Sequence, residues 1–220
     1  MLALRQAASF VLFGSLISLS AVPAHAQRGG GWGRMFQLPA VTLAQLDAVQ
    51  EDLKLSDEQK KQVAELNEKL NEERRELFSG GQGGDREQFR EKWTKFNADA
   101  TNSFNEILDD AQEKRAQEIF IQVNGPAVLV QESVSESLKI TDEQKEQMQD
   151  VLAASRDEFM GAGLRDMDRE EAAKKIAELN ASRDEKLLAV LTEDQRAEFK
   201  KMQGAKIEID LSELPRPGRS

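Results

Sequence analysis

The sequence predicts an all-helical protein made of two tandem copies of an elongated helical-hairpin unit with short flanking helices. Three observations support this fold class. The chain contains an internal repeat, each copy carries apolar residues at helical spacing, and four short segments have the form of a helix N-terminal cap. Because aromatic residues make up only 5% of the chain, we expect thin helix packing and an elongated shape.

The internal repeat is clearest at residues 53–62. The segment LKLSDEQKKQ recurs 85 residues later as LKITDEQKEQ (residues 138–147), with seven of ten positions identical. Further along the copies the offset falls to 83 residues. The loss lies at the Gly-rich turn 79–84 and its counterpart around 161–163, where a surface loop tolerates a change in length. The two copies join at the segment 124–126, Asn-Gly-Pro.

Apolar residues within each copy follow the helical period. The stripe in the first copy is Phe89, Trp93, Phe96, Ala100, Phe104 and Ile107. The equivalent stripe in the second copy is Ala172, Ile176, Leu179, Arg183, Leu187 and Val190. These steps of three and four predict paired helices at 57–78 with 86–107 and at 142–160 with 169–190. A unit of about 80 residues with few large apolar groups is marginal alone, so we expect the copies to stabilise each other.

The N-terminal segment has the features of a secretory signal peptide. Arg5 provides a short positive region, a mostly apolar stretch follows, and Ala24-His25-Ala26 has the form of a cleavage site. We therefore expect cleavage after Ala26, and a periplasmic or secreted protein without membrane insertion. The expected organisation is a signal peptide (1–26), a flexible Gly-rich tail (27–41), helical repeat 1 (42–124), helical repeat 2 (125–204) and an extended C-terminal tail (205–220). Residues 206–211 alternate in polarity as a β-strand would.

The composition argues against several classes of function. The formal net charge of −10 disfavours nucleic acids and anionic membranes as partners. The chain has no Cys and no Tyr, and its single His lies in the expected signal peptide. Since common catalytic bases and thiol nucleophiles are missing, we expect no enzyme, no catalytic residues and no cofactor. Without imidazole or thiolate ligands, we also expect no transition-metal site.

Four segments share one motif, in which an aliphatic residue precedes a cap residue and a Gln follows three positions after the cap. They consist of Leu55, Ser56 and Gln59; Leu108, Asp109 and Gln112; Ile140, Thr141 and Gln144; and Leu191, Thr192 and Gln195. This spacing predicts a capping box, in which the cap oxygen and the Gln side chain each bond the other residue's backbone. The residue that would complete a local hydrophobic staple is charged in all four segments. We therefore expect the leading Leu or Ile to pack between helices.

At these motifs the sequence resembles the Spy/CpxP family of periplasmic proteins, which carry two Leu-Thr-x-x-Gln motifs per chain. The resemblance covers roughly residues 43–203, with one motif pair in each copy. It implies an all-helical chain whose two copies build a dimer-like cradle, so that one polypeptide acts as a monomeric pseudo-dimer. Two departures are the Asp at 109 and the acidic net charge, since a Spy-type cradle is basic.

The resemblance implies a chaperone that works without ATP and binds unfolded or partly folded client proteins. The candidate client-binding residues, chosen for adaptable apolar contact, are Phe89, Trp93, Phe96, Phe104, Met148, Phe159 and Met160. Core packing is the competing interpretation of the same residues. One alternative function is an envelope-stress module that regulates one sensor protein, and another is a metal-sensing relative. A pull-down that yields many clients or one stoichiometric partner would separate the first two.

Overall fold

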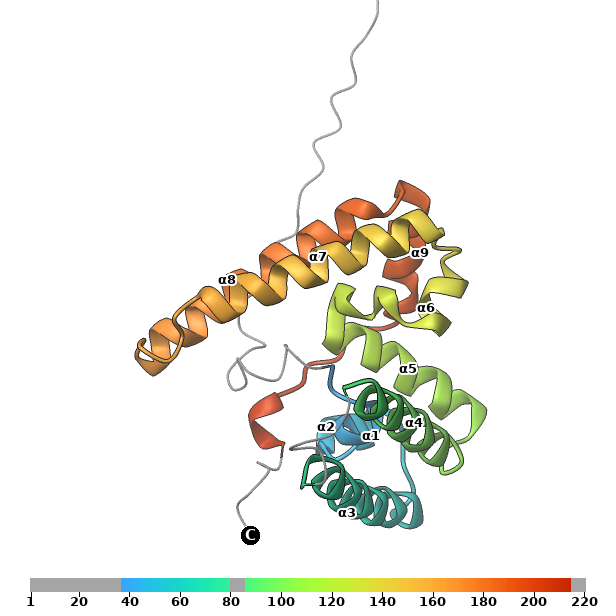
Figure 1. Cartoon of the computed structure of the whole chain (residues 1–220). Helices are drawn as coiled ribbons and strands as arrows, with labels where there is room; N and C mark the ends of the chain where they lie inside the picture. Colours follow the sequence, from blue (N-terminus) through green and yellow to red (C-terminus); the bar gives the residue numbers. More distant parts are fainter. Residues whose placement is uncertain (1–36, 80–85, 215–220) are drawn as a thin grey trace, which may run out of the picture.

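The computed structural model describes residues 37–79 and 86–214, and in these segments all the regular secondary structure is helical, with no β-strand (Figure 1). The expected signal peptide, the rest of the N-terminal tail to residue 36, and residues 80–85 and 215–220 lie outside the described residues. The α-helices are α1 (Ala40–Leu43), α2 (Asp47–Asp52), α3 (Asp57–Ser79), α4 (Arg86–Asn105), α5 (Asp110–Asn124), α6 (Glu132–Ser137), α7 (Asp142–Gly161), α8 (Arg169–Val190) and α9 (Glu193–Met202). Two 3-10 helices are η3 (Gly125–Val130) and η4 (Leu211–Glu213).

The four long helices lie where the apolar spacing predicts them, to within two residues at each end. The largest difference is at the end of α4, where 106–107 form a turn. There the N–H of Ile107 bonds to the carbonyl of Phe104, and the N–H of Leu108 bonds to that of Asn105. The last turn tightens in this way because the next helix begins directly afterwards at its cap, Asp109.

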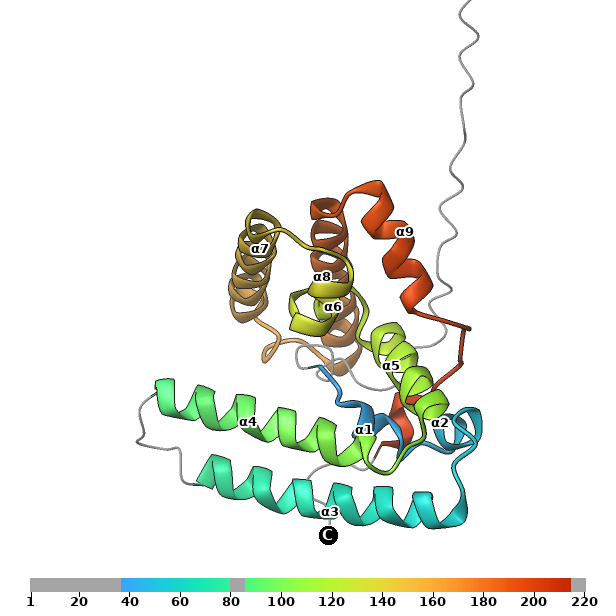
Figure 2. The same cartoon turned by 90° about the vertical axis from the view of Figure 1, so that its right-hand side faces the viewer.

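The long helices pack as consecutive neighbours. Figure 2 shows α3 and α4 side by side, and Figure 1 shows the same for α7 and α8. The two pairs run in different directions. Figure 1 looks along α3 and α4 and shows α7 and α8 from the side, whereas Figure 2 shows α3 and α4 from the side. Between them lie α5, η3 and α6, which connect the first half of the chain to the second.

Two main clusters of buried apolar residues form the core, and α5 contributes to both. Ala116 and Ile119 belong to the first cluster, whereas Phe120 and Ile121 belong to the second. The other members of the first cluster are Val41, Leu43, Ala44, Leu46, Val49, Leu53, Leu55, Val63, Leu70, Ala100 and Phe104. The other members of the second cluster are Val128, Leu129, Val134, Leu138, Ile140, Met148, Leu187, Leu191 and Phe199.

Both described ends of the chain cross to the opposite half. At the N-terminal end, Gln37 Nε2 donates to the carbonyl of Ala127 in the second half at 2.8 Å. The Asn124 side chain accepts from the N–H of Leu38 at 2.7 Å and donates to its carbonyl at 3.0 Å. Val41, which the sequence analysis places at the end of the flexible tail, is a buried residue of α1. The strand pattern of 206–211 also produces no strand. That segment lies against the first core cluster without a neighbouring strand to pair with in the described chain.

No helix in the described part of the chain is long and apolar enough to cross a membrane.

The shared core predicts that the halves are weak alone. If the chain is divided between Asn124 and Gly125, α5 should expose Phe120 and Ile121. Loss of the buried contacts of each side chain should lower the free energy of unfolding by about 2–5 kcal/mol. Each half expressed alone should therefore melt at a much lower temperature than the whole chain, or the two should reassociate when mixed. Circular dichroism melts and sedimentation of the separate and mixed halves measure this. Two halves that stay monomeric and melt as the whole chain does would contradict the shared core.

Candidate functional site

The two motifs of each half meet through a pair of Gln side chains. In the first half, Gln59 Nε2 donates to Gln112 Oε1 at 2.7 Å, and Gln112 Nε2 donates to Gln59 Oε1 at 3.1 Å. In the second half, the corresponding distances between Gln144 and Gln195 are 2.7 and 3.0 Å. We call each of these two arrangements a glutamine junction.

Each junction also binds backbone carbonyls of the partner motif. Gln59 donates to the carbonyl of Ile107 at 2.8 Å, and Gln144 donates to that of Val190 at 2.9 Å. Gln112 donates to Leu53, and Gln195 donates to Leu138, both at 3.2 Å. The two halves thus make matching contacts at residues that the repeat aligns.

All four motifs form the expected capping boxes. The hydroxyls of Ser56, Thr141 and Thr192 each accept from the backbone N–H of their Gln at 3.2 Å. Asp109 accepts from the N–H groups of Ala111 and Gln112, both at 2.9 Å. In return each Gln Oε1 accepts from the backbone N–H of its cap residue. One amide therefore caps its own helix and links that helix to another.

The leading aliphatic residues pack into the core, as the sequence predicts. Leu55, Ile140 and Leu191 are buried, and Leu108 is half-buried against the first core cluster. Leu55 and Leu108 share the first cluster, whereas Ile140 and Leu191 share the second. The polar and apolar parts of each motif pair therefore join the same helices.

Sequence reasoning missed the backbone conformation just before two of the motifs. Lys54 and Lys139 have φ of 52° and 51°, in the left-handed region that L residues rarely adopt. They end α2 and α6 in the Schellman arrangement, in which Leu55 N–H bonds to the carbonyl of Gln50 and Ile140 N–H bonds to that of Ser135. The shared LK sequence at equivalent repeat positions is the signal that could have indicated it.

The aromatic residues of α4 form a cluster at the far end of the α3–α4 pair. Phe89 and Trp93 stack with ring centroids 6.4 Å apart, and Trp93 and Phe96 with centroids 5.5 Å apart. The sequence analysis did not include Phe78 of α3. Its ring centroid lies 5.7 Å from those of Phe89 and Trp93. We call these four residues the aromatic tip. Phe78 is 55% exposed, while the other three are half-buried.

The equivalent end of the α7–α8 pair is closed. Ile176, which the repeat aligns with Trp93, is only 2% exposed. It packs with Phe159 and with Leu164 from the turn between α7 and α8, and Met167 of the same turn covers this cluster. The corresponding segment of the first half, residues 79–84, has the sequence SGGQGG and so offers no apolar side chain equivalent to Leu164 or Met167.

Three candidate client-binding residues lie in the core instead. Phe104 and Met148 are 1% and 0% exposed, and Phe159 is buried against Leu164 and Ile176. Phe104 and Met148 are interior because the apolar stripe of each long helix faces its partner helix near the junction, whereas Phe159 is interior at the closed end of the α7–α8 pair. These residues are unavailable for surface contact in this conformation. Met160 is 75% exposed and stands outside the core clusters of the described residues.

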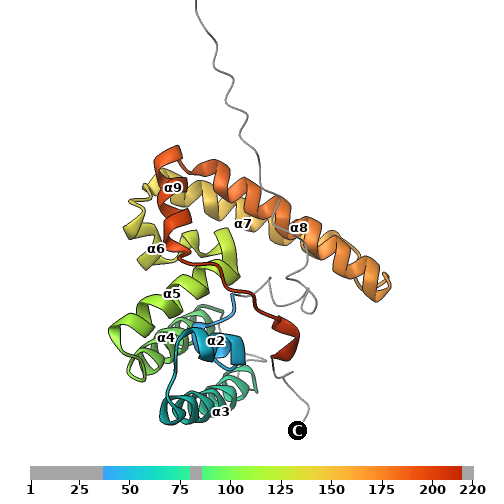
Figure 3. The same ribbon diagram turned by 180° about the vertical axis from the view of Figure 1, so that it is seen from behind.

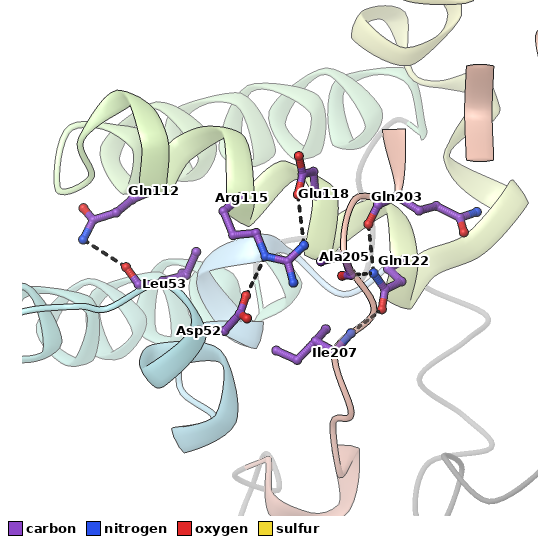
Figure 4. Close-up of polar contacts among 9 residues, drawn as sticks. All are labelled: Asp52, Leu53, Gln112, Arg115, Glu118, Gln122, Gln203, Ala205 and Ile207. Carbon is purple, nitrogen blue, oxygen red and sulfur yellow. Dashed lines mark hydrogen bonds and ion pairs between the residues drawn. The ribbon is translucent and has the colours of Figure 1, made fainter. Parts of the chain in front are cut away.

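An ion pair ties α2 to α5 beside the first junction (Figure 4). Arg115 Nε donates to Asp52 Oδ2 at 2.6 Å, and its Nη1 donates to Glu118 Oε2 at 2.9 Å. The hydrogen bond to Asp52 raises the pKa of Arg115 above its ordinary value, and partial burial opposes this rise. Among the described residues, no group of three or more His, Cys, Asp or Glu side chains could hold a metal ion.

No family model matches the chain, and no curated protein or solved structure is significantly similar to it. The family resemblance of the four motifs therefore stays a prediction.

Replacing a junction glutamine should lower the free energy of unfolding more than replacing an exposed glutamine of the same helix. Gln144→Ala removes the bonds to Thr141, Val190 and Gln195, and should lower the free energy of unfolding by about 2 kcal/mol. Gln147→Ala, at an exposed position of the same helix, should change it by less than about 0.5 kcal/mol. Urea unfolding measures both. Equal effects would show that the junction adds nothing to stability.

The motif's aliphatic residue should matter more than its cap. Thr141→Ala removes one cap oxygen and should cost about 1 kcal/mol. Leu191→Asp places a carboxylate among buried apolar side chains and should cost about 4 kcal/mol. Thermal melts of both variants test the difference. A Leu191→Asp variant as stable as Thr141→Ala would contradict the role of the leucine in packing.

Proposed function

We propose that the protein is an ATP-independent chaperone that binds apolar segments of unfolded or partly folded proteins at the aromatic tip. It acts in the periplasm or outside the cell after cleavage behind Ala26, and it performs no catalysis. The observation that carries this proposal is the exposure of the tip, where Phe78 remains 55% accessible beside three half-buried rings.

The difference between the two halves supports a binding role. The second half fills the equivalent position with Leu164 and Met167, so the fold can cover the end of such a helix pair. The first half keeps large aromatic side chains there and follows α3 with a turn of small and polar residues. A contiguous aromatic surface that is left accessible is typical of a protein-binding site.

The expected affinity of the tip is suited to reversible binding. If a client covers about 100 Å² of aromatic surface at roughly 25 cal/mol per Å², the contact contributes about 2.5 kcal/mol. Such a weak, non-directional contact accepts many sequences and releases them readily. The formal net charge of −10 in turn helps to keep a complex with an aggregation-prone client in solution.

The finer architecture that we propose is a single-chain pseudo-dimer of the Spy/CpxP type. The repeat at residues 53–62 and 138–147 and the two matching glutamine junctions support a duplicated helical-hairpin unit. In this proposal the two helix pairs form the arms of a cradle. The arms then have different roles, because the aromatic tip belongs to the first arm alone.

An aggregation assay tests the function. The mature, tag-free protein should suppress light scattering by two unrelated, chemically denatured clients at near-stoichiometric ratio without nucleotide. Phe78→Gln should weaken protection by about fivefold, since roughly 1 kcal/mol of apolar contact is lost. Val130→Thr changes an exposed apolar residue outside the tip, at 37% accessibility and not among the candidate client-binding residues, and should leave protection unchanged.

Circular dichroism of both variants checks that the fold is intact. Absence of protection in the wild-type protein would rule out the chaperone function. Equal loss in both variants would rule out the aromatic tip as the binding surface.

A further inference from the structure

The chain after α9 crosses the molecule as a strap, which we define as residues 205–214. It leaves the end of α9, passes α5 and ends beside α1 and α2 in the first half (Figures 1 and 3). Its apolar side chains Ile207, Ile209, Leu211 and Leu214 pack against the first core cluster. Between them, Glu208 and Asp210 are exposed. The strap therefore presents aliphatic side chains to the core at every second residue from 207 to 211.

One side chain of α5 holds the backbone at the start of the strap (Figure 4). Gln122 Nε2 donates to the carbonyls of Gln203 and Ala205 at 2.8 and 3.0 Å, and Gln122 Oε1 accepts from the N–H of Ile207 at 2.9 Å. All three bonds involve main-chain groups, two of them in the strap and one at Gln203, the C-cap residue of α9. Gln122 can thus hold an extended segment of any sequence.

The hold on the rest of the strap is weak. Its other backbone hydrogen bonds in the described chain are local turns, from Glu213 to Asp210 and from Leu214 to Leu211. Ile207, Ile209 and Leu211 are only half-buried. A segment with partial burial and few polar ties can leave its surface without disturbing the helices beneath it.

A glycine in the left-handed backbone conformation separates the strap from α9. Gly204 has φ of 62°, and a Cβ there would lie 2.0 Å from the Glu118 carboxylate. The chain therefore turns at a glycine that its neighbours require, directly next to the ion pair of Arg115. Gly204 thus connects the strap to the end of α9.

We infer that the surface under the strap is a second binding site, for extended segments of unfolded proteins with aliphatic side chains at alternate positions. The strap is its resident occupant and competes with such segments. The chemistry follows from Gln122, which binds the backbone, and from the first core cluster, which receives the aliphatic side chains. The choice of an unfolded client rests on the proposed function. The site itself is separate from Phe78, the exposed residue of the aromatic tip, because Phe78 is not part of the first core cluster.

A labelled peptide tests the site directly. The probe is fluorescein-labelled QGAKIEIDLSEL, which copies residues 203–214. The full mature chain carrying Ile207→Asp and Ile209→Asp should release its strap and bind the probe in a 1:1 complex. A tethered strap has an effective concentration of about 1 mM, so a probe with Kd near 10 μM should bind the wild-type chain about 100-fold more weakly.

Three controls define the chemistry. Adding Gln122→Ala to the double variant should abolish binding of the probe. The rearranged peptide QGAKEDSEIILL, with the same composition and no alternation, should not bind. An unfolded, alkylated test protein should displace the probe from the double variant. If the double variant does not fold, two measurements on single chains replace it. Gln122→Ala should speed tryptic cleavage after Lys206, because the strap loses its backbone contacts. An excess of the probe sequence with its Lys replaced by Gln should speed the same cleavage in the wild-type chain, because the peptide displaces the strap, and should have no effect on the Gln122→Ala chain.

Several results would overturn the inference. These are no binding of the probe to the folded double variant, equal binding to the wild-type chain, or no displacement by the unfolded protein. A wild-type dimer that Gln122→Ala converts to a monomer would mean that a second copy's strap occupies the surface. Failure here is distinguishable from failure of the chaperone proposal, because Phe78→Gln should leave binding of the probe unchanged.

Discussion

The structure depends on how α5 divides its apolar side chains between two cores. Ile119 enters the first cluster and the next residue, Phe120, enters the second. Successive residues on a helix are about 100° apart, so α5 can present different apolar faces to the two halves. The Gln122 bonds to residues 203–207 then add a crossing near the end of the same helix. The repeat is thus built into one body rather than two domains on a linker.

The glutamine junctions show how the same contact supports two different ends. In both halves an amide caps its own helix and bonds the partner amide at 2.7 Å, so the helix pairs start from matching geometry. At their far ends the pairs differ. A third core cluster that includes Leu164 closes the end of the α7–α8 pair, whereas Phe78 at the end of the α3–α4 pair is 55% exposed. The two halves therefore share the geometry of the junction and differ furthest from it.

Local features were predictable from the sequence, and non-local ones were not. The helix limits and capping boxes follow from spacing within a few residues, and the structure has them as expected. The sequence does not show which part of each apolar stripe is covered. For Phe104 and Met148 it left surface contact and core packing both open, and both residues are buried. The sequence pattern of α3 did not indicate Phe78, because the contacts of its ring are with aromatic residues of another helix, α4. The alternation of apolar and polar residues at 206–211 likewise indicated a β-strand. In the structure the apolar side chains of this segment pack against the first core cluster instead of a neighbouring strand.

The choice of amides at the junctions has a consequence for the conditions that the fold tolerates. A Gln side chain has no proton to gain or lose across the range of pH in which proteins work, and neither do the hydroxyls of Ser56, Thr141 and Thr192. A His or a carboxylate in the same place would make the link between helices depend on acidity. The second junction, whose two caps are threonines, therefore contains no titrating group and should keep its hydrogen bonds when the pH falls, whereas the first includes the carboxylate cap Asp109.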